Sequence, residues 1–470
     1  MAVRIAVLAG YFLLVLVIGL LARSRWRATP ESFFLADRGL GTLVLLGTMV
    51  ATNFSAFTVF GASGAGYRDG YAFFPIMGFG TGFMAVTFWI LGCRIRETGR
   101  ALNLVTPPDL ILHLYRSRAV STLFAVVMVI FTLPYLALQP MAAGYVLESL
   151  VGLPYPWGAV LVTGVITLYT LRGGMRAVAW TDVFQGLLMV ILLAVSLALV
   201  SGHHGGFVSA SRKVLALSPE LFSRPGGEGT YTVGIWFSYM LLWFLCDPMF
   251  PQLFQRFYAA RDDRVIAGGM ICYPLVCTVV FFLPVTIGIL GRLSFPDLAG
   301  KEADRILPLL ISSISGDAMA ALVMAAGLAA LMSTMDSQLL TLSSIVTRDL
   351  FPKDPHQGSG GALRGRIAVI CLSAAGLALA LKPPATILQI ATQTFTGLAV
   401  LFPTVIFGLY LKRRFAASAL VSILAGEAAV AAFFFGLIPP GPFLPVVWAA
   451  GASFGAYLIC HISLLRRENV

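Results

Sequence analysis

The sequence has little charge of either sign, and it is especially short of acidic residues. Of its 470 residues, 11% are charged and 58% are hydrophobic, and only 21 are Asp or Glu against 32 Lys or Arg. Soluble domains usually carry about 25% charged residues. This shortage excludes a solvated multidomain enzyme, a disordered scaffold and a coiled coil, and it leaves a polytopic membrane protein.

Residue types that bind metals or form disulfides are also scarce. The six cysteines contain no CxxC pair, and only two of the five histidines, His203 and His204, are neighbours. The metalloprotease motif HExxH is absent from the sequence. We therefore expect no disulfide framework, no metal centre and no enzyme, with an intramembrane hydrolase as the least favoured alternative.

The sequence does contain long hydrophobic runs. A helix needs about 20 mainly apolar residues to cross the hydrocarbon core of a membrane. Thirteen stretches meet this requirement: residues 5–21, 40–64, 71–92, 120–150, 157–171, 177–201, 231–254, 265–290, 316–345, 367–381, 385–411, 416–436 and 443–464. We therefore predict an all-α polytopic membrane protein with about 13 transmembrane helices in a single membrane domain, residues 1–470.

The basic residues gather on one side when successive loops are placed on alternate sides of the membrane. That side receives most of the 32 Lys and Arg, among them Arg23, Arg25, Arg27, Arg94, Arg96, Arg176, Arg256, Lys353 and Arg466. Cytoplasmic loops are enriched in Lys and Arg. We therefore expect a plasma-membrane protein with its N-terminus outside and its C-terminus in the cytoplasm. The basic excess then requires no nucleic-acid partner.

Spans 2 and 7 are interrupted in their middle. Span 2 reads TNFSA over residues 52–56, and span 7 reads CDPMFPQ over residues 246–252. Interrupted segments at corresponding places of two halves indicate the midplane site of a transporter. The alternative is that the polar residues only pack helices and that span 7 is only kinked.

The two interruptions lie five spans apart, which suggests two inverted repeats. Residues 40–201 would form the first repeat and residues 231–411 the second. An extra N-terminal helix, residues 5–21, and two C-terminal helices within residues 416–464 would flank them.

Polar residues in spans 6 and 9 indicate cation binding. Ala330, Ser333, Thr334 and Ser337 share one face of span 9, next to Asp336. Sodium is a hard cation that prefers oxygen ligands, although hydroxyls in membrane helices often bond to their own helix carbonyls. In span 6, Asp182 fits either an ion route or a salt bridge to Arg176.

Several motifs resemble the sodium:solute symporter family. Residues 173–185, GGMRAVAWTDVFQ, are similar to its span-6 signature, and residues 332–340, MSTMDSQLL, closely resemble its sodium-site helix. PQLFQRFYAA at residues 251–260 and Gln139 on span 4 are similar to further family features. The resemblance covers roughly residues 30–430. It implies a LeuT-like inverted five-helix repeat with flanking helices and sodium-driven alternating access.

The resemblance also implies which residues bind ions. Carried over by position, the main sodium site would use the carbonyls of Ala51, Phe54 and Ala330 with the hydroxyls of Ser333 and Thr334. A second ion site would be lined by Asp182, Ser333, Asp336 and Ser337. This chain departs from the family in Asp336, where a serine is frequent, and in Asn53, where proline transporters carry an aspartate.

The solute site is expected between the interrupted spans and their neighbours. Candidate solute-binding residues are Asn53, Phe57, Phe73, Phe74, Gln139, Asp247, Phe250, Gln389 and Phe395. This aromatic and amide-rich set favours an amino acid, a monocarboxylate or a pantothenate-like solute.

We therefore predict a secondary active transporter, working as a monomer in the lipid bilayer, that couples solute uptake to Na⁺ as its coupling ion. Two alternatives remain: a proton-coupled symporter using Asp336 and Asp182, or a solute-sensing receptor built on a transporter body.

Overall fold

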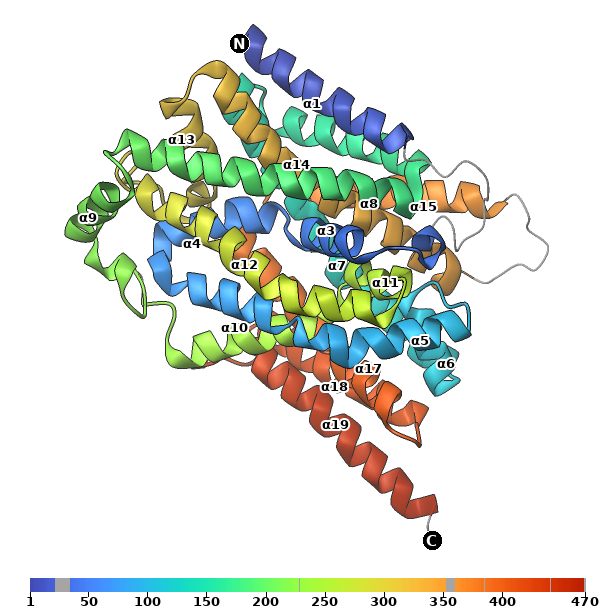
Figure 1. Cartoon of the computed structure of the whole chain (residues 1–470). Helices are drawn as coiled ribbons and strands as arrows, with labels where there is room; N and C mark the ends of the chain where they lie inside the picture. The colour runs from blue at the N-terminus through green and yellow to red at the C-terminus, as the bar shows by residue number, and fades with distance from the viewer. Residues whose placement is uncertain (22–33, 228, 352–359, 384, 440, 469–470) are drawn as a thin grey trace.

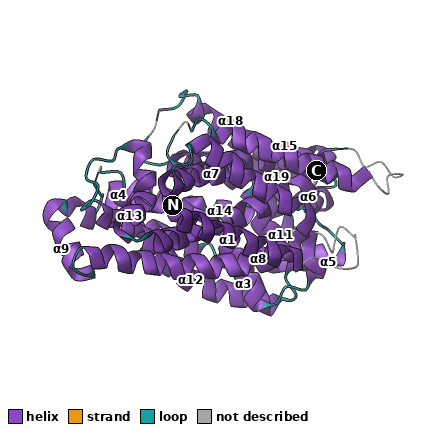
Figure 2. Ribbon diagram, turned by 90° about the horizontal axis from the view of Figure 1, so that it is seen from above, coloured by secondary structure: helices purple, strands orange, loops and turns teal. Residues whose placement is uncertain are grey.

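The structure is a computed structural model that describes residues 1–21, 34–227, 229–351, 360–383, 385–439 and 441–468. Within these ranges the chain is almost entirely helical, and its only strand-like feature is one bridge between Leu40 and Ala260 (Figure 2). The basic residues Arg23, Arg25, Arg27 and Lys353 of the predicted cytoplasmic side lie outside the described residues.

The first half of the chain forms one N-terminal helix and a series of long and broken helices. They are α1 (Ala2–Leu21), α3 (Thr42–Asn53), α4 (Ala62–Asp69), α5 (Cys93–Ala101), α6 (Pro107–Tyr115), α7 (Arg118–Val151), α8 (Tyr155–His203) and α9 (Phe207–Leu217). Predicted span 3 is irregular, because short 3-10 and π-helical turns between Gly70 and Gly92 precede α5.

The second half has a similar mixture of long and broken helices. They are α10 (Val233–Cys246), α11 (Pro251–Ala259), α12 (Asp263–Gly291), α13 (Ile306–Ile314), α14 (Asp317–Ile345), α15 (Gly360–Ala380), α16 (Ile387–Ala399), α17 (Phe402–Tyr410), α18 (Ala416–Phe434) and α19 (Pro445–Glu468). The last two pack against each other at one edge of the bundle (Figure 1).

The structure contains both predicted interruptions. Within the described ranges, nine helices are long and apolar enough to cross a membrane, and two further pairs are bent spans. Thr42–Asn53 meets Phe57–Ala72 at 62°, and Val233–Met249 meets Pro251–Ala259 at 55°. A count of thirteen spans and the inverted relation of the two repeats stay predictions.

Spans 5 and 6 are joined more closely than predicted. The helix α8 runs through both of them, and its one non-helical residue is Gly174, with φ of 66° and ψ of 179°. Glycine is the residue that takes this conformation at no steric cost, so a single residue replaces the loop expected between the two spans.

The helix α14 lies at the centre of the bundle (Figure 1). It packs against α8, α7, α15 and α1, and nearly every residue from Ala320 to Ile345 is buried. Polar residues on this helix must therefore find partners inside the protein, because neither water nor lipid can reach them.

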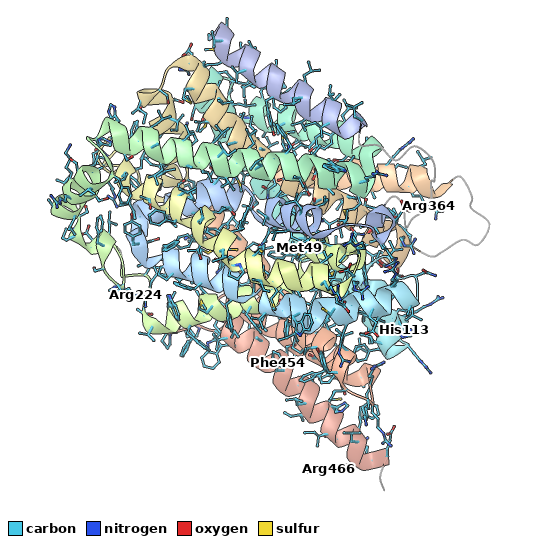
Figure 3. The ribbon with its side chains drawn as sticks, in the orientation of Figure 1. Met49, His113, Arg224, Arg364, Phe454 and Arg466 are labelled. Carbon is cyan, nitrogen blue, oxygen red and sulfur yellow. The ribbon has the colours of Figure 1, made fainter. Side chains whose placement is uncertain are left out.

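The bundle has two polar ends. Figure 3 shows His113 and Arg364 at one end of the helices and Arg224 at the opposite end. Which of these ends faces the cytoplasm stays a prediction.

Two glycines let α4 and α12 approach each other closely. A Cβ added to Gly66 would lie 2.3 Å from the Val285 carbonyl oxygen, and one added to Gly288 would lie 1.9 Å from that of Ser63. Both contacts are with backbone atoms, which cannot move away as a flexible side chain can. Glycine is therefore required on both sides of this crossing.

We predict that Gly288→Ala destabilises the protein, because overpacking of this kind costs about 1–3 kcal/mol. The measurement is the thermal unfolding midpoint in detergent. Gly269→Ala on the same helix is the control, since a Cβ there meets no atom within 4 Å. Equal midpoints for the two variants would contradict the assigned contact.

Candidate functional site

The last turn of α3 meets the middle of α14 inside the bundle. The Ser333 hydroxyl donates to the carbonyls of Ala51 at 2.9 Å and Ala330 at 3.1 Å. The Thr334 hydroxyl donates to the carbonyls of Thr52 at 3.1 Å and Ala330 at 3.3 Å. Five oxygens thus converge in one buried cluster, and four of them come from residues of the predicted main sodium site.

The carbonyls of Ala51 and Thr52 are free for this cluster because α3 ends there. The last four carbonyls of a helix lack an internal donor. The N–H of Ala56, which a continuous helix would direct to Thr52, donates instead to the Gln139 side chain at 3.1 Å. Gln139 is held in turn by the Tyr135 carbonyl at 3.0 Å. Gln139 therefore stabilises the interruption.

Phe54, the remaining member of the predicted set, directly follows the last helical residue. Its backbone is extended, with φ of −87° and ψ of 95°, and its buried ring packs against Tyr273 and Phe281. The role of the Phe54 carbonyl as a sodium ligand remains a prediction. The Thr52 carbonyl, which the sequence analysis did not select, belongs to the cluster.

Asp182 forms a fully buried ion pair close to this cluster. Its Oδ2 accepts hydrogen bonds from Thr48 at 2.5 Å, from Thr52 at 3.1 Å and from the Arg256 guanidinium at 3.0 Å. The same guanidinium nitrogen donates to the Ser337 hydroxyl at 2.7 Å. Arg256 thus bridges Asp182 and Ser337, two of the four residues predicted for a second ion site.

Two sequence-based interpretations of arginines are wrong. Arg256 was counted with the cytoplasmic basic residues, but its side chain is 0% exposed and pairs with Asp182. Arg176 was weighed as the partner of Asp182, but Arg176 is exposed. Arg256 is buried because span 7 is interrupted. It follows Pro251 by little more than one helical turn, so it is still inside the bundle.

The other two residues of the predicted second ion site bond elsewhere. Asp336 Oδ2 accepts a hydrogen bond from the Tyr169 hydroxyl at 3.0 Å, and Ser333 belongs to the first cluster. The Oδ1 atoms of Asp182 and Asp336 are buried without a hydrogen-bond partner. A buried polar atom without a hydrogen-bond partner is costly, so a cation or a proton at these oxygens would be stabilised.

A small cavity lies between the interruptions of the two spans. It holds about 230 Å³ of space not filled by atoms, its mouth included. It is lined by Asn53, Phe57, Thr58, Met77, Thr81, Tyr135, Trp243, Asp247, Phe250, Phe281 and Phe395. Five of the nine predicted solute-binding residues are in this lining: Asn53, Phe57, Asp247, Phe250 and Phe395.

The other four predicted residues do not line this cavity. Gln139 supports the interruption of α3, and Gln389 forms a capping box with Thr386 at the start of α16. Phe73 packs against Tyr231, and Phe74 packs against Phe282. Residue type suggested a binding role for these four, but their neighbours give them packing and capping roles.

Six lining residues were not selected from the sequence: Thr58, Met77, Thr81, Tyr135, Trp243 and Phe281. Helical periodicity predicts two of them. Trp243 lies one helical turn before Asp247, and Tyr135 lies one helical turn before Gln139, so each shares a helix face with a predicted residue. Residues on the irregular turns of span 3, such as Thr81, follow no such period.

A second buried carboxylate cluster ties three elements together at the end of the bundle where α4 finishes. Asp304, on the 3-10 turn η8 (Gly300–Arg305), pairs with Arg68 at 3.3 Å and accepts from the N–H of Ile387 at 2.9 Å. Burial raises the pKa of Asp304 to about 6, although Arg68 opposes the shift. One carboxylate thus links α4, η8 and α16.

Known proteins resemble the chain over most of its length. A model of the sodium:solute symporter family matches residues 33–426. The sodium/pantothenate symporter of Escherichia coli (strain K12) is 29% identical over 407 residues, which are 84% of this chain and 83% of that protein. The osmoregulated proline transporter OpuE of Bacillus subtilis (strain 168) is 27% identical over 442 residues, 92% and 88% of the two chains.

Solved structures share the fold. A Na⁺-coupled sialic acid symporter in a substrate-bound outward-open state matches with a TM-score of 0.81 and 19% identity, over 97% of both chains. Mhp1, a transporter of the nucleobase-cation-symport-1 family, matches with a TM-score of 0.64 and 14% identity, over 94% of this chain and 96% of its own. With the family model matched over most of its length, the chain belongs to the sodium:solute symporter family, whose members are transporters and not enzymes.

Proposed function

We propose that the protein carries a small organic solute into the cell together with sodium. The observation that carries this proposal is the buried cluster in which the carbonyls of Ala51, Thr52 and Ala330 meet the hydroxyls of Ser333 and Thr334. Five neutral oxygens in a water-poor interior suit a hard cation. The sodium/pantothenate and proline transporters among its relatives support sodium as the coupling ion and a small solute as the cargo.

Coupling follows from the position of α3 between the two sites. The carbonyls of Ala51 and Thr52 face the ion cluster, and the next side chain, Asn53, lines the cavity. A sodium ion held by the end of α3 and by α14 would fix Asn53 and order the cavity wall. By linkage, solute binding must then strengthen sodium binding by the same factor.

A second cation or a proton would act at the Asp182–Arg256 pair. Asp182 and Asp336 bring two carboxylates, and the one guanidinium of Arg256 bonds to Asp182 and Ser337. A further positive charge at Asp336 would balance the group. Proton coupling through Asp336 and Asp182 is therefore the second candidate mechanism, and the unpartnered Oδ1 atoms favour it.

The first test is uptake by the purified full-length chain in proteoliposomes, with L-proline and pantothenate as labelled probes. An inward sodium gradient should drive uptake, and a potassium gradient of equal size should not. Uptake driven equally well by a proton gradient in sodium-free buffer would favour the second candidate.

The ion cluster is tested by removing its two hydroxyls. Ser333→Ala and Thr334→Ala should each raise the sodium concentration for half-maximal thermal stabilisation about tenfold, because bonds to charged groups contribute about 1.5–3 kcal/mol. The control is Ser344→Ala on the same helix, whose hydroxyl bonds only to the Thr341 carbonyl. An unchanged sodium requirement in both variants would exclude the assigned site.

The buried ion pair should be essential for stability. Arg256→Gln leaves Asp182 buried without its cation, and breaking such a pair typically costs about 3–5 kcal/mol. Adding Asp182→Asn should recover much of this loss, and thermal unfolding in detergent measures both. Arg261→Gln is the control, because the Arg261–Asp262 pair is exposed and contributes little. Additive effects of the two buried substitutions would contradict the pair.

We also propose that the N-terminus lies outside and the C-terminus in the cytoplasm of a plasma membrane, because most Lys and Arg then face the cytoplasm. A green fluorescent protein fused to the C-terminus should fluoresce, and alkaline phosphatase fused there should be inactive. The opposite pattern would reverse the orientation.

A further inference from the structure

Asp247 is a buried acid in the cavity, and the part of the chain that the structure describes gives it no basic partner. It lies at the interruption of span 7, its side chain is 1% exposed, and it lines the cavity. Its Oδ2 accepts from the Asn53 amide at 3.3 Å, and its Oδ1 has only the weak donor Cys246 Sγ at 3.4 Å. Among the described residues no Lys, Arg or His forms an ion pair with Asp247, and none lines the cavity.

This arrangement differs from that of Asp182, the buried acid that pairs with Arg256. Asp182 has a guanidinium at 3.0 Å, whereas Asp247 has only neutral neighbours. A carboxylate in such surroundings is stabilised by a cation that enters from outside. The cavity that Asp247 lines is the route by which such a cation reaches it.

Aromatic rings make up most of the remaining wall. Trp243 lies 5.6 Å from Phe57 and 5.3 Å from Phe395, measured between ring centroids. Phe395 also lies 4.9 Å from Tyr135 and 4.8 Å from Phe250. The faces of aromatic rings attract cations, and cages of such rings recognise alkylated ammonium groups.

The wall also holds polar groups that lack partners. Trp243 Nε1, Thr58 Oγ1 and Thr81 Oγ1 are buried without a hydrogen-bond partner. All three can donate, and the indole nitrogen can only donate. A ligand acceptor that reaches these groups would satisfy them, and a carboxylate is the strongest such acceptor.

Resting on the symport function proposed above, we propose that the transported solute carries an ammonium group, which Asp247 and the aromatic cage bind, together with a carboxylate that accepts hydrogen bonds from the unpartnered donors. The solute class is a small zwitterion such as an amino acid, an imino acid or a betaine. A solute that is only anionic, such as pantothenate, would place a second negative charge beside Asp247.

The test compares solutes of matched shape with and without the positive charge. Glycine betaine is paired with 3,3-dimethylbutanoate, and L-proline with tetrahydrofuran-2-carboxylate. The twenty amino acids and pantothenate complete the panel. Sodium-dependent thermal stabilisation of the purified full-length protein is measured for each. We expect at least one of the two zwitterions to bind at least about tenfold more tightly than its counterpart without the positive charge.

A substitution then assigns the effect to Asp247. Asp247→Asn keeps the size of the side chain and should reduce the preference for the zwitterion to about threefold or less, by removal of the ion pair. Glu427→Gln neutralises another acid, one that does not line the cavity, and should retain the full preference. The comparison of paired solutes on the unmodified chain needs no variant, so it holds even if Asp247→Asn fails to fold.

Three results would overturn the proposal. They are equal binding of the paired solutes, binding of pantothenate but of no zwitterion, and no stabilisation by any ammonium compound. If Asp247→Asn instead loses its sodium response while the paired solutes bind equally, Asp247 holds the coupling ion. Failure of the proposed symport function gives a different result from these three. In that case sodium would have no effect on the unmodified chain with any solute.

Discussion

The structure depends on one constraint, which is that a helix interrupted inside a membrane must find partners for the backbone groups it releases. At the end of α3 the side chain of Gln139 takes the N–H of Ala56, and the hydroxyls of Ser333 and Thr334 take the carbonyls of Ala51 and Thr52. The released carbonyls gather with the hydroxyls into one oxygen-rich cluster. The groups that satisfy the broken helix are thus the groups that suit a sodium ion.

The distribution of charge is opposite inside and outside the bundle. The chain as a whole has 32 basic and 21 acidic residues, an excess of positive charge. Around the two breaks, however, the described residues place three buried acids, Asp182, Asp247 and Asp336, against the one buried arginine, Arg256. An interior short of positive charge favours the entry of cations, which is what sodium-coupled symport of a small solute requires.

Several features of the protein follow from local sequence alone. Hydrophobic runs of sufficient length predict the membrane spans, and the prolines and polar residues at 246–252 predict a break that the structure shows as a bend of 55°. The helical period places Ser333 and Thr334 on the face of α14 that meets α3. These features depend on residues within a few turns of one another, so periodicity and composition are enough to find them.

The sequence by itself determined an all-helical membrane protein with two broken spans, the hydroxyl face of α14 and its resemblance to a symporter family. Only the tertiary structure decided that Arg256 is buried against Asp182, that Gln139 supports the break, and that Asp247 lines a cavity with aromatic side chains. These relations join residues far apart in the chain. They depend on which helix faces pack together, and local periodicity does not specify that choice.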